Sequence, residues 1–285
     1  MRVGIAAACV LIFGVSVMAP TPALAKGQNR GIGWIPEETR SGPMSLHSQR
    51  FWVEGRIFPD RETTFNGNWR WIVGRDELGI HGIYFDVKNK GTIAGDIRDS
   101  RMGDASVVWR HYFKSGSDTH WSIQPGVEFN SWRGLNETSN LSAHDDSPIW
   151  TLALTVGQED EQGISWVIEP RIAGWADHVS TTSGTEIDSF GTVFGVRFAG
   201  SSKLATRWWL VGEVTPLISG DNTFDKDTGD LNKEVILNIG FLTITKSKAW
   251  AKIGVTNGAG TTIATSMLAA PDVSAGFIIQ AGTSF

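Results

Sequence analysis

Cysteine is almost absent from this chain: Cys9 is the single one among 285 residues. A lone cysteine cannot close a disulfide within the chain, and it cannot supply the several thiolates of a structural zinc site. Cys9 also falls inside an amino-terminal apolar stretch that is expected to be removed, and acylation there would leave too short a hydrophobic segment before it. The mature chain is therefore expected to fold without thiols, disulfides or cysteine-bound metals.

Long hydrophobic runs are also missing after the amino-terminal region, where no stretch approaches the about 20 apolar residues of a membrane helix. Charged residues make up 19% of the chain and the mean hydropathy is -0.10, which excludes a disordered chain and one rich in membrane helices. The formal charge of -5 gives no reason to expect a nucleic-acid partner. A β-barrel stays compatible with these values, because only alternate residues of its strands face lipid.

The first 25 residues have the layout of an export signal. Arg2 gives a positive start, an apolar stretch runs from Val3 to Met18, and Ala23-Leu24-Ala25 places small residues where a signal peptidase cuts. Cleavage is expected before Lys26. The sequence thus predicts a signal peptide at 1–25, a periplasmic segment at 26–48 and a barrel domain at 49–285.

The carboxyl-terminal residues alternate between larger and smaller side chains from Val273 to Phe285. A period of two predicts a strand with two different faces. A two-faced strand that ends in Phe resembles the assembly signal of bacterial outer-membrane β-barrel proteins, carried here by Phe277, Ile279 and Phe285. The resemblance implies the bacterial outer membrane as the location, its lipid and lipopolysaccharide as the surroundings, and the barrel-assembly machinery as a partner.

The same alternation recurs along the chain and predicts about twelve strands. Short polar connections, such as 114–118 and 199–202, alternate with longer ones, such as 89–103 and 132–148. Short periplasmic turns, long external loops and an even strand number are typical of outer-membrane barrels. The expected fold class is all-β: a transmembrane, antiparallel, up-and-down β-barrel of about twelve strands. The expected strands are 49–57, 67–75, 79–88, 104–114, 119–131, 149–157, 164–175, 188–198, 206–217, 233–244, 249–256 and 273–285.

The two faces of the strands can be assigned from their polarity. In 119–131 the odd positions are mostly apolar and the even positions polar, so the even positions are expected to face the lumen. In 188–198 the apolar residues are at even positions, so Phe190, Phe194 and Phe198 are expected to face lipid there. A water-soluble sandwich or lipocalin-like barrel would show this alternation with its apolar face inward. The 13 tryptophans, which suit the boundary between lipid and water, favour the membrane barrel.

Charged residues at expected lumen positions are the candidate functional residues. They carry both signs, and a charge that faced hydrocarbon would be costly, so they must face water or one another. Two arrangements are compatible with the pattern: Arg and Glu that pair and fill the lumen, or a narrow aqueous path lined by them. The lumen-lining candidates are Arg50, Glu54, Arg56, Arg70, Asp86, Arg110, Glu128, Glu169, Arg171, Arg197, Arg207, Glu213, Glu234 and Lys252.

An internal repeat relates two of the expected strands. Trp121-Ser-Ile-Gln-Pro125 recurs as Trp166-Val-Ile-Glu-Pro170, and the stretch from Trp209 to Pro216 resembles a third copy. Because proline cannot donate to the strand ladder, a β-bulge is expected at each of the three prolines. A bulge would exchange the inward and outward faces beyond it.

Catalysis is a weaker hypothesis. His120-Trp-Ser122 has the His-x-Ser spacing of outer-membrane phospholipases, but Ile123-Gln124 stands where that family has Asn-Gly. His120 and Ser122 are also expected to face the lumen, whereas that family's site faces lipid. The protein is therefore not expected to be an enzyme, and no cofactor is expected.

One loop resembles a calcium-binding loop because it is dense in carboxylates. Its glycine comes one place too early for an EF-hand, and Ile236 stands where the bidentate Glu would be needed. A solvated loop without metal is the expectation. The candidate ligands, were a metal bound, are Asp221, Asp225, Asp227 and Asp230.

The sequence thus favours a monomeric outer-membrane barrel that passes small solutes or ions passively through a charge-lined lumen. Two alternatives stay open: a closed structural or surface-recognition barrel that acts through its external loops, and a membrane-embedded hydrolase. Some outer-membrane transporters of hydrocarbon and phenol pathways are similar in length and strand pattern, which is a likeness of fold.

Overall fold

The computed structural model shows an all-β chain. The residues that it describes are 48–58, 63–73, 76–93, 97–113, 119–136, 141–159, 164–181, 184, 186–224, 230–245, 249–269 and 275–284. The expected signal peptide and Phe285, the last residue of the expected assembly signal, lie outside the described residues.

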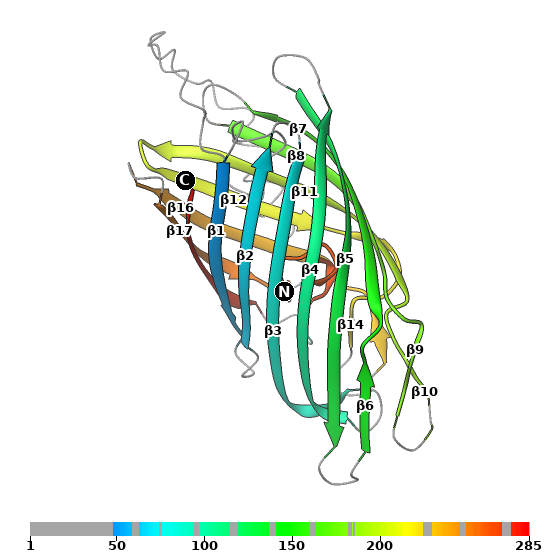
Figure 1. Ribbon diagram of the computed structural model, residues 1–285. Helices are drawn as coiled ribbons and strands as arrows, with labels where there is room; N and C mark the ends of the chain where they lie inside the picture. The colour runs from blue at the N-terminus through cyan, green and yellow to red at the C-terminus, as the bar shows by residue number, and fades with distance from the viewer. Residues whose placement is uncertain are drawn as a thin grey trace.

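Twelve antiparallel strands form a closed barrel in which each strand pairs with its neighbours along the chain (Figure 1). The sheet closes where β18, the last strand, pairs with β1, so that Phe51 lies beside Thr283 and Arg56 beside Ile278. A closed barrel leaves no edge strand with unpaired backbone groups, as a lipid environment requires. The barrel strands are β1 (Ser48–Ile57), β2 (Thr63–Val73), β3 (Asp76–Ile93), β4 (Ile97–Phe113), β5 (Thr119–Asn136), β7 (Pro148–Glu159), β8 (Ile164–Gly174), β11 (Thr192–Ala205), β12 (Trp208–Thr215), β16 (Ile236–Ile244), β17 (Ala249–Thr256) and β18 (Gly276–Ser284).

The two ends of the barrel differ. At the short-turn end, where β1 begins and β18 ends, few residues separate consecutive strands: β2 from β3, β4 from β5, β7 from β8, β11 from β12 and β16 from β17. The opposite, loop end carries additional elements, several of which extend beyond the barrel wall (Figure 1). These are β6 (Leu141–Asp145), which pairs with β5, the hairpin of β9 (His178–Ser180) and β10 (Glu186–Asp188), the short strand β13 (Leu217–Ser219), and the pair β14 (Thr223–Phe224) and β15 (Leu231–Asn232).

The predicted fold class and strand number are confirmed, but several predicted connections are wrong, among them 132–148, most of which lies in β5 and β6. Most of 89–103, expected as a loop, extends the β3–β4 hairpin to Ile93 and Ile97. The stretch 199–202, expected as a turn, lies within β11, and the chain reverses at 206–207 instead. Small residues mimic a turn in composition, but Ala199 and Ser201 point into the barrel, and Ser201 shares a 2.6 Å hydrogen bond with Ser165.

The three prolines of the repeat interrupt the strand ladder in the same way. Opposite Pro125 the paired positions pass from Val108–Gly126 to His111–Ile123 without a change of register. The β7–β8 pairing is interrupted in the same way opposite Pro170. The pairing of β11 with β12 and β13 is interrupted in the same way opposite Pro216. In each case the gap faces the preceding strand, to which proline has no N–H to donate.

The predicted bulges at the prolines are therefore wrong at Pro125 and Pro170, and the inward and outward faces continue past both residues. At Pro216 the chain leaves β12 and re-enters the sheet as β13. The register shifts only beyond it, where Gly195 lies opposite Leu217 and Phe194 opposite Ser219. Proline thus removes ladder bonds here without inserting a residue.

The outer surface of the barrel is apolar and the inner surface polar. On the outside, Phe65 and Phe277 are each 62% exposed, whereas on the inside Asn66 and Glu128 are fully buried. Along β5, the outward-facing Trp121 and Phe129 are about 26 Å apart at a rise of about 3.3 Å per residue. Shortened by strand tilt, that span fits the about 25 Å apolar band of membrane barrels, with aromatic residues at both interfaces. This polarity is the inverse of a water-soluble barrel's.

Candidate functional site

The barrel interior holds most of the charged residues that the sequence pattern selected. Ten of the candidates are buried with their side chains inside the barrel, and no more than 8% of any of them is exposed. They therefore line a filled interior rather than a wide aqueous pore. These residues are Glu54, Arg56, Arg70, Arg110, Glu128, Glu169, Arg171, Arg197, Glu213 and Lys252.

The remaining four candidates differ from that placement or cannot be assigned. Arg207 is wrong as a lumen residue, because it is exposed in the turn between β11 and β12. Glu234 precedes β16 and is half-buried, and its backbone N–H donates to Asn222. The side chains of Arg50 and Asp86 lie outside the described part of the structure. Phe190 was also expected to face lipid, but it packs edge-on against the inward-facing Trp175 at a ring distance of 5.7 Å.

Glu169 on β8 is the centre of the largest charge cluster. Its carboxylate oxygens lie 2.6 Å from Arg171 Nε, 3.3 Å from Arg197 Nε and 3.6 Å from Arg110 Nη2. Thr155 Oγ1 donates to it at 2.6 Å. Arg197 also reaches Glu213 on β12, with Nη1 3.4 Å from Oε2. Five strands of the wall, β4, β7, β8, β11 and β12, are thereby joined through one buried network.

Two further ion pairs stand on the β1–β3 side of the interior. Arg56 pairs with Glu54, two residues before it on β1, and Glu54 also accepts hydrogen bonds from Asn66 and Gln280. Arg70 on β2 pairs with Glu77 on β3, across the turn between those strands. Tyr112 donates to the second oxygen of Glu77 at 2.7 Å. These pairs brace the wall next to the β18–β1 seam.

The sequence pattern missed three inward-facing residues: Glu77, His81 and Asp104, all buried. Glu77 was placed in a predicted turn, and His81 lies on β3, whose inward positions are odd-numbered. His81 packs edge-on against Trp52 at 6.1 Å. Extending the alternation of polar and apolar residues back from Ile80 to Asp76 would have identified Glu77.

A chain segment fills the loop end of the lumen. After β17, residues 257–269 turn inward and form a 3-10 helix at Thr265–Met267 instead of an external loop. We call residues 257–269 the inner segment. Glu128 on β5 accepts hydrogen bonds from Thr262 Oγ1 at 2.6 Å and from the backbone N–H of Ala264 at 2.9 Å.

Three other side chains hold the inner segment in place. Arg171 Nη1 donates to Ser266 Oγ at 2.5 Å, and Arg56 Nη1 donates to the carbonyl oxygen of Gly258. Asn222, which follows β13, donates to Met267 O at 2.8 Å and accepts from Ala269 N at 2.9 Å through its own carbonyl. These side chains thus satisfy polar groups of the segment that would otherwise be buried without a partner.

Apolar side chains pack inside the barrel both toward the loop end and toward the short-turn end. At the loop end, Ile263 and Met267 of the inner segment pack with inward-facing wall residues that include Trp175 and Leu217. At the short-turn end, a second cluster joins four strands. It comprises Trp52, Trp209, Val211, Leu242, Ile244 and Trp250. Apolar clusters therefore lie toward both ends of the interior, and charged side chains lie between and beside them, with Arg70 over the Trp52 ring at 5.6 Å.

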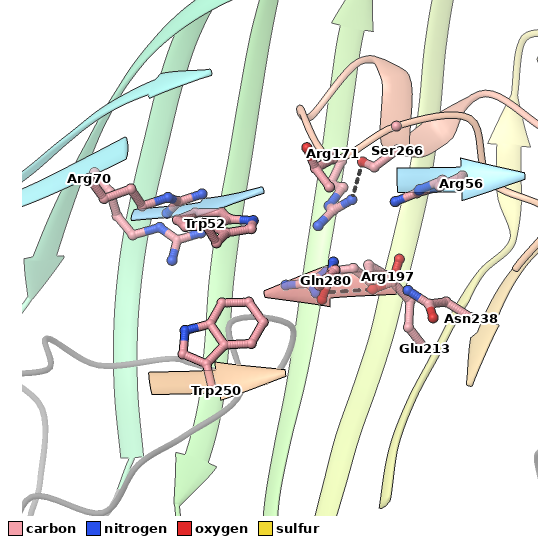
Figure 2. Close-up of a pocket in the computed structure, with 13 residues that line it drawn as sticks. Trp52, Arg56, Arg70, Arg171, Arg197, Glu213, Asn238, Trp250, Ser266 and Gln280 are labelled. Carbon is pink, nitrogen blue, oxygen red and sulfur yellow. Dashed lines mark hydrogen bonds and ion pairs between the residues drawn. The ribbon is translucent and has the colours of Figure 1, made fainter. Parts of the chain in front are cut away.

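A cavity of about 80 Å³ remains among these charged side chains (Figure 2). Five arginines reach its surface from five different strands: Arg56, Arg70, Arg110, Arg171 and Arg197. Glu213 supplies a carboxylate, and Gly260, Thr261 and Ser266 of the inner segment form its boundary toward the loop end. Trp52 and Trp250 lie toward the short-turn end, and Asn238 and Gln280 complete the wall.

The catalytic and metal candidates gain no support. Ser122 is buried toward the interior, and the side chain of His120 is not among those that the structure describes. In the loop with candidate calcium ligands, Asp225 and Asp227 lie outside the described residues. Within the described residues, no group of three or more His, Cys, Asp or Glu side chains is placed to hold a metal ion.

No family model and no curated protein matches the chain. Among solved structures it is similar to the translocator domain of the autotransporter NalP from Neisseria meningitidis, with 9% identity and a TM-score of 0.47, over 84% of this chain and 87% of that one. It is also similar to the toluene transporter TodX from Pseudomonas putida, with 7% identity and a TM-score of 0.44, over 84% and 89%. Because these scores lie below 0.5, the barrel assignment rests on strand pairing and burial.

Proposed function

We propose that the protein is a monomeric outer-membrane channel for small solutes or ions that rests in a closed state, with the inner segment as its gate. The barrel is closed on itself and apolar outside, which suits a lipid bilayer. The expected export signal and assembly signal support the outer membrane as its location. Transport through such a channel is passive and requires no cofactor.

The observation that carries this proposal is that a separate chain segment, rather than the wall alone, closes the loop end. Strand ladders hold the wall residues, whereas the inner segment is attached by side-chain contacts, by apolar packing and by backbone hydrogen bonds at its two ends. The backbone bonds join Asn257 N to Leu237 O and Ala269 N to Asn222 O, and the side chains are those of Glu128, Arg171, Arg56, Asn68 and Asn222. Elements held by few contacts open at lower free energy than the body of a fold. The arginine-lined cavity lies on the side of the segment that faces the short-turn end.

Single-channel recording in planar bilayers tests the proposal. The wild type is expected to show little steady conductance, and a variant in which 259–268 is replaced by a Gly-Ser linker of equal length is expected to conduct. The matched control replaces the β9–β10 hairpin, 178–188, which extends from the loop end but does not fill the lumen. It is expected to stay as silent as the wild type.

A second candidate function is a closed structural or surface-recognition barrel. It is favoured by the interior itself, in which buried arginines pair with buried carboxylates and apolar clusters lie toward both ends. A linker variant that folds and inserts but does not conduct would support this alternative and contradict the channel.

A further inference from the structure

The cavity among the charged side chains has a strongly one-sided lining. Five guanidinium groups and one carboxylate reach its surface. The carboxylates that pair with these arginines, Glu54, Glu77 and Glu169, are not among the residues that line it. The space itself is therefore bounded by an excess of positive charge.

Because these arginines are buried, the repulsion between their positive charges is strong. Each of the five is at most 8% exposed, so water screens their mutual repulsion poorly. A negatively charged group in the cavity would relieve that repulsion. The planar guanidinium fork matches the oxygen geometry of carboxylate and phosphate, which makes arginine the preferred partner of such groups.

The size and the neutral lining of the cavity point to the same ligand class. Its volume of about 80 Å³ exceeds the about 10–15 Å³ that one water needs, and is of the order needed for a single small oxyanion. Gln280, Asn238, Thr261 and Ser266 offer amide and hydroxyl groups from different elements. Arg56 on β1 and Arg171 on β8 reach the cavity from strands that lie six places apart in the twelve-stranded wall, and both are drawn in Figure 2.

We propose that this cavity is a binding site for a small oxyanion, a phosphate- or carboxylate-bearing solute, held by Arg56, Arg171 and Arg197 with Arg70 and Arg110. The proposed site assigns a ligand class to the lumen, and its role in transport rests on the proposed channel function. Binding itself needs no conduction. Residues of the inner segment line the cavity together with wall residues, so a bound anion would contact both the wall and the gate.

Isothermal titration of the purified full-length protein in detergent with sodium phosphate, at constant ionic strength adjusted with sodium chloride, tests the site. Saturable binding of one phosphate per barrel is expected. Sulfate and acetate titrations distinguish a general oxyanion site from one that requires phosphate. A wild type that gives no saturable heat with any of the three anions would overturn the proposal.

Two variants and a control make the test specific. Asn238→Asp adds a negative charge to the cavity wall at nearly constant volume and is expected to weaken binding at least tenfold. Arg56→Lys with Arg171→Lys keeps the charge but removes both forks, and the same loss is expected. Arg207→Gln removes a cation in an exposed turn and is expected to leave binding unchanged. Equal binding by wild type and Asn238→Asp contradicts the site, even if the double variant fails to fold.

The outcomes separate this inference from the channel proposal. Saturable phosphate binding in a protein whose linker variant never conducts would leave the site standing and contradict the channel. A conducting linker variant whose wild-type parent binds no oxyanion would contradict the site and leave the channel standing.

Discussion

Arg171 and Ser266 are 95 positions apart in the chain, and a hydrogen bond of 2.5 Å joins their side chains inside the barrel. The same guanidinium contacts Glu169 through Nε at 2.6 Å. One residue of the wall therefore connects the charge network to the inner segment. The closure of the lumen and the stability of the wall depend on the same set of side chains.

Removing the carboxylate of Glu128 is expected to loosen the inner segment. Glu128→Ala strips the acceptor from Thr262 and Ala264, whereas Glu128→Gln keeps an oxygen that can accept one of the two bonds. Leaving a buried donor without its acceptor costs about 1–3 kcal/mol. Hydrogen exchange of 257–269 should be much faster in Glu128→Ala and intermediate in Glu128→Gln. Unchanged protection in both variants would show that apolar packing alone holds the segment.

Breaking the Arg197 pair is expected to destabilise the barrel. Arg197→Gln leaves Glu213 and Glu169 with fewer cationic partners in a buried site, and the loss of one partner of a buried pair typically costs about 3–5 kcal/mol. Adding Glu213→Gln should recover part of that loss. Urea unfolding of the two single variants and the double variant measures the coupling. Additive effects would contradict a direct Arg197–Glu213 interaction.

The lipid-facing and inward-facing sides of β17 are expected to respond differently to charge. Lys252 points inward and is 2% exposed, whereas its neighbour Ile253 points outward and is 57% exposed. Ile253→Lys should cost about 2–4 kcal/mol if that position lies near the bilayer midplane. Thr206→Lys, in the exposed short turn between β11 and β12, is the control and should be nearly neutral. Folding titrations into lipid vesicles measure both, and equal costs would show that the outer face does not contact lipid.

Gly254 on β17 is expected to reject even a methyl group. A Cβ there would lie 2.2 Å from the carbonyl oxygen of Ile239 and 2.7 Å from the Cα of Gly240, which are backbone atoms of the paired strand. Gly254→Ala should therefore cost about 1–3 kcal/mol. Gly67→Ala, where a Cβ would meet nothing within 4 Å, should change stability by at most about 0.5 kcal/mol. Heat-unfolding of the two folded proteins gives the comparison.

The sequence by itself determined the architecture, because the alternation of polar and apolar residues is a local property of each strand. A period of two assigns Ser122 and Glu128 to one face and Trp121 and Phe129 to the other whatever the partner strands are. The faces hold through Pro125 because a missing N–H deletes ladder bonds without inserting a residue. Twelve strands and a closed barrel follow from such patterns repeated along the chain.

Tertiary structure alone decided how the interior is filled. Which arginine meets which carboxylate depends on register and barrel curvature, so no local pattern predicts that Glu169 contacts Arg110, Arg171 and Arg197 together. The sequence of the inner segment predicts an external loop, because its contacts with Glu128 and Arg171 join positions far apart in the chain and leave no local pattern. Its inward path pairs polar groups with Glu128, Arg171 and Arg56, which come together around it only in the tertiary structure.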